Sequence, residues 1–386
     1  MPDTGKKLKL VYITPALYMA GGVERVLTLK ANFFAEHYGY DITIILTEGK
    51  GKPLFYPLSD KIKVINLDVG FEELWTCSFL KKIFVYLKKQ RQYKKALTQE
   101  LMRIRPDIVI SLLRREINFI NDIKDGSRKI GELHVNRANY RNFEANEANY
   151  IKNLFAKFWM SSLVSKLKRL DSFVVLTEED KQAWPELNNV TVIQDPLPFM
   201  PTHYSSLTEK RVIAVGRYVY QKGFDLLLQA WSKIEKQNQD WELCVFGDGN
   251  REPYEQQVNE LGIDRSRCHL NGPTANIQKE YVNSSVFVFS SRFEGFGMVL
   301  VEAMACGLPV VSFACPCGPK DIIKDGGDGL LVENGNVEAL ADGLSKLMGD
   351  DALRHRMAAN GINNVQRFSI EHIAECWKKL FVRTVR

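Results

Sequence analysis

The sequence predicts an α/β protein built from two doubly wound domains, each with a parallel sheet. Strand-like segments rich in β-branched residues alternate with helix-like segments along most of the chain. This alternation is typical of a parallel sheet that helices cover on both faces. A proline-rich stretch at 194–210 interrupts the pattern, and a second series of strands and helices begins after it. The length of 386 residues gives each series a domain of ordinary size.

The first domain is predicted at 1–197, where strand-like runs are bounded by turns. Its strands are expected at 9–14, 41–46, 63–68, 107–112, 129–134 and 172–177, and its helices at 23–37, 79–105 and about 145–169. The basic patch and apolar run at the amino terminus resemble a secretory signal, but Thr14 and Pro15 interrupt the run and Glu24 follows soon after. A buried first strand is therefore favoured over a signal peptide.

The second domain is predicted at 198–369 and repeats the same alternation. Its strands are expected at 211–216, 242–247, 268–272, 286–290, 309–313 and 329–332, with a helix at 337–348. The chain ends in an amphipathic helix at 370–386 that no strand follows. Two such domains joined by a linker predict a cleft between them, and ligands of doubly wound folds bind beyond the carboxyl ends of the strands.

The composition excludes several classes of protein. A content of 45% hydrophobic and 25% charged residues is ordinary for a globular protein, and no apolar run approaches the roughly 18 residues of a membrane span. The seven cysteines are an odd number in largely apolar surroundings, which favours a reduced, cytoplasmic chain over a disulfide framework. Cys315 and Cys317 form a C-x-C pair without a second pair nearby, so a metal site there is only weakly indicated.

A strongly basic helix is predicted at 79–105. It holds nine basic residues and one acidic residue, Glu100, and it ends before Pro106. Its apolar residues recur at helical spacing: Leu80, Ile83, Phe84, Leu87, Leu97, Leu101 and Ile104. Two interpretations stay open: a solvated basic face, or peripheral contact with the anionic inner surface of the membrane.

The stretch SSRFEGFGMVLVEAMACGLPVV, residues 290–311, places two carboxylates around a glycine turn. It follows a predicted strand, and a helix is expected to start near Gly297. Gly295 and Gly297 allow the backbone to approach a ligand closely, and the free amides of a helix start suit a phosphate. Glu302 then lies one turn into the helix, where it can accept hydrogen bonds from ribose hydroxyls, and Glu294 lies beyond the phosphates. The alternative is a solvated surface turn.

Three further segments follow predicted strands. In AVGRYVYQKGFD, Arg217 and Lys222 lie beside a helix start and can bind a diphosphate. Gly21 and Gly22 separate the first strand from the first helix and let backbone reach a ligand. His134, in GELHVNR, ends a strand, where residues of the cleft are expected.

The segment EGFGMVLVE at 294–302 resembles the E-x7-E motif of retaining glycosyltransferases with the GT-B fold, most closely family 4 (glycosyl transferases group 1) of the bacterial surface-polysaccharide type. VGRYVYQKGFD resembles the Arg/Lys diphosphate motif of that family, and GGVER resembles its amino-terminal glycine loop. FACPCGPKDIIKDGGDGLLV resembles a loop of family members that use UDP-hexose or UDP-N-acetylhexosamine. The resemblance covers nearly the whole chain.

The resemblance implies a role for each matching residue in binding the donor. Arg217 and Lys222, together with the amides of Met298 and Val299, are expected to bind the donor diphosphate. Glu302 is expected to hold the ribose.

Other matching residues are expected to meet the sugar. Glu294 and the amides of Phe296 and Gly297 would hold the donor sugar, and His134 would lie near the sugar and the acceptor. The final helix would pack back on the first domain. Relatives often carry Asn-Pro at the domain hinge, whereas this chain has Asp195 before Pro196.

The resemblance implies a metal-independent transfer that retains the anomeric configuration and needs no cofactor besides the nucleotide sugar. The resemblance of the loop implies a UDP-linked donor. A saccharide or lipid-linked saccharide would be the acceptor, and no nucleic acid is expected as a partner. Three other functions stay open: a nucleotide-sugar 2-epimerase of the same fold, a glycosidase that uses Glu294 and Glu302 as acid and base, and a non-catalytic sugar-nucleotide-binding protein.

Overall fold

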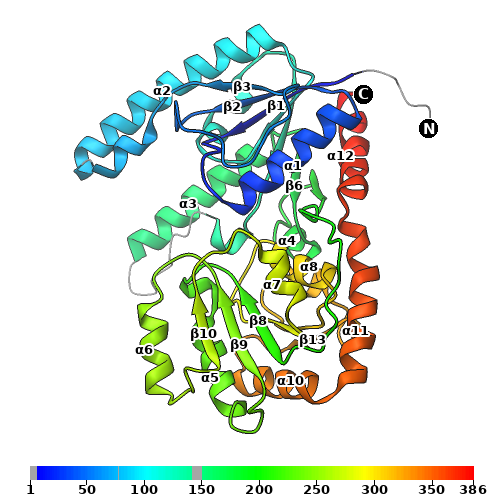
Figure 1. Ribbon diagram of the computed structural model, residues 1–386. Coiled ribbons are helices and arrows are strands. Elements are labelled where there is room, and N and C mark those ends of the chain that lie inside the picture. The colour runs from blue at the N-terminus through cyan, green and yellow to red at the C-terminus, as the bar shows by residue number, and fades with distance from the viewer. Residues whose placement is uncertain (1–6, 77, 141–149) are drawn as a thin grey trace. The chain divides into compact units, whose positions relative to one another are not determined.

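The computed structural model describes residues 7–76, 78–140 and 150–386 (Figure 1). The chain divides into two compact units: Met1–Pro196 with Ile370–Arg386, and Leu197–Ser369. The division after Pro196 lies one residue before the boundary predicted from the sequence, and the final helix belongs to the first unit.

The first unit contains a seven-stranded parallel sheet. Its strands are β1 (Lys9–Thr14), β2 (Asp41–Leu46), β3 (Lys63–Asn66), β4 (Ile108–Ser111), β5 (Arg128–Glu132), β6 (Ser172–Val175) and β7 (Val190–Val192). Their order in the sheet is β3-β2-β1-β4-β5-β6-β7, and every pair is parallel. The sequence did not predict β7, since this edge strand has three residues that are only half-buried and so lacks a long apolar run.

Helices cover both faces of the first sheet. They are α1 (Gly22–His37), α2 (Phe79–Ile104), α3 (Tyr150–Leu167), α4 (Glu178–Gln182) and α12 (Ile370–Val385), with short 3-10 helices η1 (Phe71–Thr76), η2 (Arg115–Asn118), η3 (Ile120–Asp122) and η4 (Arg137–Asn139). Residues 145–149 of the predicted third helix, and Cys77, lie outside the described residues.

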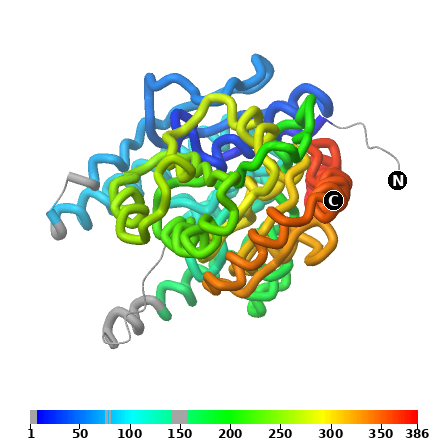
Figure 2. The backbone as a smooth tube through the Cα atoms, turned by 60° about the horizontal axis from the view of Figure 1, so that its bottom comes forward, coloured from blue at the N-terminus to red at the C-terminus, as the bar shows by residue number. Residues whose placement is uncertain are grey.

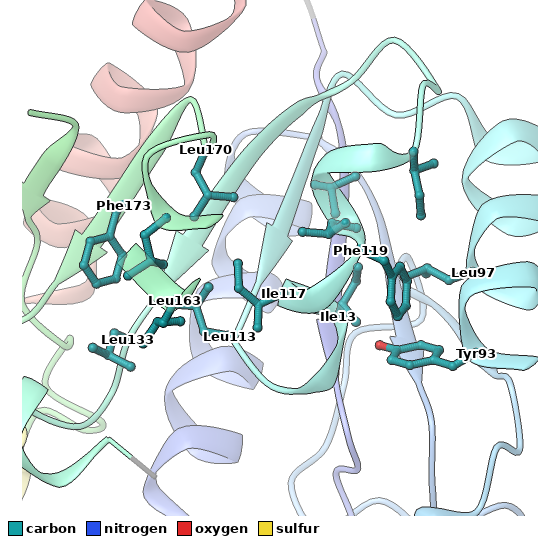
Figure 3. Close-up of a cluster of buried hydrophobic side chains, with 14 of the residues drawn as sticks. Ile13, Tyr93, Leu97, Leu113, Ile117, Phe119, Leu133, Leu163, Leu170 and Phe173 are labelled. Atoms are coloured by element: carbon teal, nitrogen blue, oxygen red, sulfur yellow. The ribbon is translucent and has the colours of Figure 1, made fainter. Parts of the chain in front are cut away.

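Alternate residues of the central strands fill two separate cores, as the two-residue period of a strand requires. Val11 and Ile13 of β1 face the core that Figure 3 shows, together with Tyr93 and Leu97 of α2. Tyr12, from the same strand, faces the opposite core.

The second core joins the two ends of the chain. Phe34 of α1 packs edge-on against Phe381 of α12, with ring centroids 5.6 Å apart. The red carboxyl-terminal helix accordingly lies beside the blue amino-terminal elements in Figure 1 and Figure 2. The sequence resemblance implied this packing against the first domain.

The predicted apolar stripe of α2 is buried only in its second half. Leu97 and Leu101 are fully buried, but Ile83, Phe84 and Leu87 are exposed, and Phe84 is 77% exposed. The first half of the helix extends beyond the sheet, which leaves these apolar side chains exposed (Figure 1). The side chain of Leu80 lies outside the described residues. No helix within the described ranges has both the length and the apolar character that crossing a membrane requires.

The second unit contains a six-stranded parallel sheet. Its strands are β8 (Arg211–Val215), β9 (Glu242–Phe246), β10 (Cys268–Asn271), β11 (Val286–Phe289), β12 (Val310–Phe313) and β13 (Gly329–Val332), in the order β10-β9-β8-β11-β12-β13. Its helices are α5 (Phe224–Ile234), α6 (Glu252–Glu260), α7 (Ile277–Val282), α8 (Met298–Ala305), α9 (Pro319–Ile322), α10 (Val337–Gly349) and α11 (Asp351–Asn364), with η5 (Tyr220–Lys222) and η6 (Val365–Phe368). The order reverses at β8 and β11, whose carboxyl ends carry both predicted donor segments.

Candidate active site

The two glutamates of the motif at 294–302 are buried in the second unit. Glu294 lies in the loop between β11 and α8, Glu302 lies in the second turn of α8, and they are 7% and 4% exposed. Gly297 precedes α8 with φ of 103°, a left-handed conformation that favours glycine. A solvated surface turn does not describe this arrangement, because both carboxylates are withdrawn from water and need polar partners.

Glu294 is held by the second predicted donor segment. Lys222 Nζ lies 2.7 Å from Glu294 Oε1, and Gln221 Nε2 donates to Glu294 Oε2 at 3.3 Å. The two segments meet because the turn after β8 lies against the end of β11. A Cβ on Gly223 would lie 2.1 Å from the Ser290 carbonyl oxygen, so only glycine fits this approach.

Arg217, the other predicted phosphate ligand, is exposed at the carboxyl end of β8. Among the described residues, no hydrogen bond or ion pair holds its guanidinium. The stem of Lys222 crosses Gly216 directly before it, where a Cβ would lie 3.1 Å from the lysine Cγ and Cδ. Both cations therefore lie at the same end of β8, with Lys222 ordered by Glu294 and Arg217 available to a ligand.

Glu302 lies deeper in the unit than Glu294. The Tyr281 hydroxyl, from α7, donates to Glu302 Oε2 at 3.2 Å. Burial raises the pKa of the nearby Cys306 thiol to about 12, with the negative charge of Glu302 as a smaller cause. Both of these neighbours of Glu302, the Cys306 thiol and the Tyr281 hydroxyl, are neutral. The Glu302 carboxylate is therefore suited to accept hydrogen bonds from neutral donors.

The start of α8 presents backbone amides between the two glutamates. The first amides of any helix have no carbonyl partner within it, and those of Met298 and Val299 occupy these positions here. The Phe296 ring is buried against Phe368, with centroids 5.4 Å apart, so the loop of Gly295, Phe296 and Gly297 is anchored by its side chain. The arrangement provides an anion site at the helix start.

The glycines predicted in the first unit lie at the start of α1. Gly21 is its N-cap, with an ordinary φ of −89°. A Cβ on Gly21 would meet only the end of the Glu24 side chain, and a Cβ on Gly22 would have nothing within 4 Å. The local fold therefore does not require glycine at position 21 or 22. The sequence-based hypothesis that these glycines let the backbone approach a ligand closely stays a prediction.

His134 lies just beyond β5 and is largely buried, with a side chain that is 7% exposed. Its Nε2 is 3.2 Å from Glu132 Oε1 and its Nδ1 is 3.4 Å from Asp195 Oδ1. Burial by itself lowers the pKa of His134, but Asp195 and then Glu132 outweigh burial and raise this pKa to about 9.

A buried lysine completes this group. The Lys30 ammonium, from α1, contacts the same Glu132 oxygen and lies 4.4 Å from the centre of the Trp377 ring. Burial alone would raise the pKa of Glu132, whereas Lys30 and then His134 lower it to about 2. Glu132, His134 and Asp195 have ligand atoms within 4.8 Å of one another, but the oxygen they share already faces a lysine ammonium, so the group is an ion-pair chain.

Several of these contacts were not predicted from the sequence. Gln221, Tyr281 and Glu132 are ordinary polar residues with no distinctive spacing from the groups they touch. Lys30 could have been identified from the sequence, because it occupies the apolar face of α1 between Leu27 and Phe34. A lysine at such a position needs a buried partner.

Comparison with known proteins shows what the chain is similar to. Residues 200–364 match the family model described as Glycosyl transferases group 1. The chain is 27% identical over 387 residues to the amylovoran biosynthesis glycosyltransferase AmsD of Erwinia amylovora, covering 96% of this chain and 99% of AmsD.

Two further similarities cover almost the whole chain. It is 28% identical over 385 residues to the GalNAc-alpha-(1->4)-GalNAc-alpha-(1->3)-diNAcBac-PP-undecaprenol alpha-1,4-N-acetyl-D-galactosaminyltransferase of Campylobacter jejuni, covering 97% of this chain and 98% of that enzyme. A solved structure of a mutant of S. aureus TarM, in complex with fondaparinux, alpha-GlcNAc-glycerol and UDP, matches with a TM-score of 0.75 at 18% identity, over 97% of this chain and 99% of TarM. The chain therefore has the GT-B fold, and its residues 200–364 are similar to the glycosyl transferases of group 1.

Proposed function

We propose that the protein transfers a hexose or N-acetylhexosamine from a UDP-sugar to a saccharide or lipid-linked saccharide during the synthesis of a bacterial surface polysaccharide. The observation that carries the proposal is the meeting of Lys222 with Glu294 beside the open amides of α8. Such a site combines cations, helix amides and buried carboxylates, which suits a diphosphate joined to two sugars. The TarM structure contains UDP, and the C. jejuni enzyme is named for an undecaprenol-linked acceptor.

In this proposal, each donor group meets a different part of the site. The diphosphate is neutralised by Arg217 and Lys222 and accepts hydrogen bonds from the amides of Met298 and Val299. Glu302 accepts hydrogen bonds from the ribose hydroxyls. The cations need no divalent metal to stabilise the charge that develops on the leaving group.

The sugar is assigned to Glu294 and the loop beside it. Glu294 accepts from sugar hydroxyls, with the amides of Phe296 and Gly297 next to it. Gly21 and Gly22 give backbone access on the first unit, and His134 supplies a positive charge near the reaction.

The proposed reaction retains the configuration of the anomeric carbon. A bond forms between the acceptor oxygen and the anomeric carbon as the bond from that carbon to the diphosphate oxygen breaks. The acceptor proton passes to the departing diphosphate oxygen on the same face, and UDP leaves. Glu294 positions the sugar and forms no covalent bond to it.

The test is transfer from a radiolabelled UDP-sugar, chosen by a thermal-shift screen across nucleotide sugars. Lys222→Met and Glu294→Gln should each lower kcat/KM by at least about 100-fold, the effect of losing one charged group that acts in the transition state. Lys236→Met, an exposed cation of the same unit, is the matched control and should retain activity. Full activity in both site variants would refute the assignment, and sugar conversion without an acceptor would identify an epimerase instead.

We also propose that α2 contacts an anionic membrane surface. Ile83, Phe84 and Leu87 are exposed on the projecting half of the helix, next to the exposed Lys82 and Lys88. Apolar side chains among cations suit insertion between anionic lipid headgroups.

Flotation with vesicles of phosphatidylglycerol tests the membrane proposal. Phe84→Ser should reduce binding several-fold, whereas Met102→Ser, which alters another exposed apolar residue at the far end of the same helix, should not. Absence of binding by the unmodified protein at low salt would exclude this interaction.

A further inference from the structure

Four buried charged groups in the first unit form a chain of alternating sign. Lys30 contacts Glu132, Glu132 lies 3.2 Å from His134, and His134 lies 3.4 Å from Asp195. Lys30 comes from α1, Glu132 from β5, His134 from just beyond β5, and Asp195 from the last residues before the chain enters the second unit. Each is no more than 7% exposed, so water screens these charges very little.

The protonation state of His134 decides whether this group is electrically balanced. With His134 protonated, two cations face two carboxylates. With His134 neutral, Lys30 alone would face two buried carboxylates, and one buried negative charge would be left without compensation. Such a charge is strongly unfavourable in a protein interior.

The placement of the ring reinforces this balance. Each ring nitrogen of His134 faces a different carboxylate, although neither contact has hydrogen-bond geometry. The attraction is therefore mainly Coulombic. Tyr12, on β1 of the same sheet, is a further titratable group that interacts with Glu132. Its pKa is raised, mainly by burial and also by Glu132, so it stays neutral and adds no charge.

We propose that Asp195 and Glu132 hold His134 as an imidazolium cation at neutral pH, so that His134 cannot serve as a base in the reaction. Asp195 and Glu132 are positioning residues for this cation, and Lys30 keeps Glu132 ionised. In the proposed transfer, His134 then contributes positive charge, and the proton of the acceptor must go elsewhere. This role rests on the proposed function, but the protonation state itself does not.

Asp195 determines whether His134 is protonated, because burial alone would favour the neutral ring. The negative charge of Asp195 contributes more than that of Glu132 to raising the pKa of His134, while burial acts in the opposite direction. Replacing Asp195 with the neutral, equally sized Asn leaves Lys30 and Glu132 as a balanced pair. The same buried ring would then favour its neutral form.

Nuclear magnetic resonance of the full chain labelled with 15N-histidine tests the inference directly. The chain has six histidines, and the spectrum of His134→Gln assigns the His134 signals. A titration from pH 5 to 10 should show the imidazolium pattern of His134 persisting past the value of about 6.5 that is usual for histidine. In Asp195→Asn the midpoint should fall by at least about one pH unit.

The control is Asp68→Asn, which removes an exposed carboxylate of the same unit and should leave the His134 midpoint unchanged. A midpoint at or below about 6.5 in the unmodified protein, or no change in Asp195→Asn, would overturn the proposal. The unmodified protein alone gives a decisive result if the variant does not fold.

Transferase assays separate this inference from the proposed function. If the protein transfers sugar, kcat/KM of the Asp195→Asn variant should decline at a lower pH than that of the unmodified protein. If no sugar is transferred, the proposed function fails, but the NMR midpoints still decide the protonation state of His134.

Discussion

Replacing Lys30 with methionine should strongly destabilise the first unit. The two side chains have similar length and volume, so the change removes the ammonium group without opening a large cavity. The lost contacts are the ion pair with Glu132 and the approach to the Trp377 ring. The structural consequence is a carboxylate in the core whose remaining cationic partner, within the described residues, is His134.

The magnitude follows from burial. The Lys30 and Glu132 side chains are 2% and 1% exposed, and removing one partner of such a pair typically costs about 3–5 kcal/mol. The second oxygen of Glu132 has no hydrogen-bond partner among the described residues, so little can compensate for the loss. A unit of about 200 residues loses roughly 2–4 °C in melting temperature per kcal/mol, which predicts a drop of roughly 6–20 °C.

Thermal and urea unfolding of four proteins measure the effect: the unmodified chain, Lys30→Met, Glu132→Leu and the double variant. The double variant should be more stable than the sum of the two single losses predicts, because Leu and Met leave no unpaired charge and His134 remains balanced by Asp195. Loss of less than about 1 kcal/mol in Lys30→Met, or strictly additive losses in the double variant, would show that Lys30 and Glu132 do not depend on each other.

Three other predictions concern pH and the second unit. The pKa of His134 is about 9 in the folded protein and about 6.5 in the unfolded chain. Protonated His134 therefore stabilises the folded state fully below about pH 6.5, and this stabilisation is lost as the pH rises through about 9. Urea unfolding should show a loss on the order of 3 kcal/mol over this range, and a constant free energy of unfolding would contradict it. Tyr281→Phe removes the hydroxyl that donates to Glu302 and should weaken UDP binding in calorimetry by about 1 kcal/mol, whereas unchanged affinity would separate that glutamate from the ribose. Gly223→Ala forces a Cβ against the Ser290 carbonyl at a φ of 62° and should lower the free energy of unfolding of the second unit by at least about 1 kcal/mol in urea unfolding; an unchanged free energy of unfolding would show that this approach is not tight.

Most of the fold was predictable because parallel strands are buried on both faces. Such strands appear as continuous apolar runs between turns, and all strands predicted in both domains are present. The sequence missed β7, whose three residues are only half-buried. It also missed α11, where the buried positions include Gly361 and Arg354 in place of a regular apolar stripe.

The candidate site was predictable where chemistry is local. The turn that contains Gly297 and the helix start after it are encoded in a few consecutive residues. The contact of Lys222 with Glu294 joins residues 72 positions apart, so the sequence offered a donor-binding hypothesis for each residue but no sign of the contact between them. The donation from Tyr281 to Glu302 was not predictable, since a tyrosine on a short helix is usually part of the core.

Charge balance links Asp195, which precedes Pro196, to Lys30 on the apolar face of α1. Asp195 by itself would add a negative charge to a buried site that already contains Glu132, and two buried carboxylates repel each other. Lys30 neutralises Glu132, and this leaves Asp195 free to pair with a protonated His134. A chain with Asp195 but without a cation at position 30 would have to bury an excess negative charge or protonate a carboxylate. The two residues are 165 positions apart, yet the electrostatics of one buried cluster make each a condition for the other.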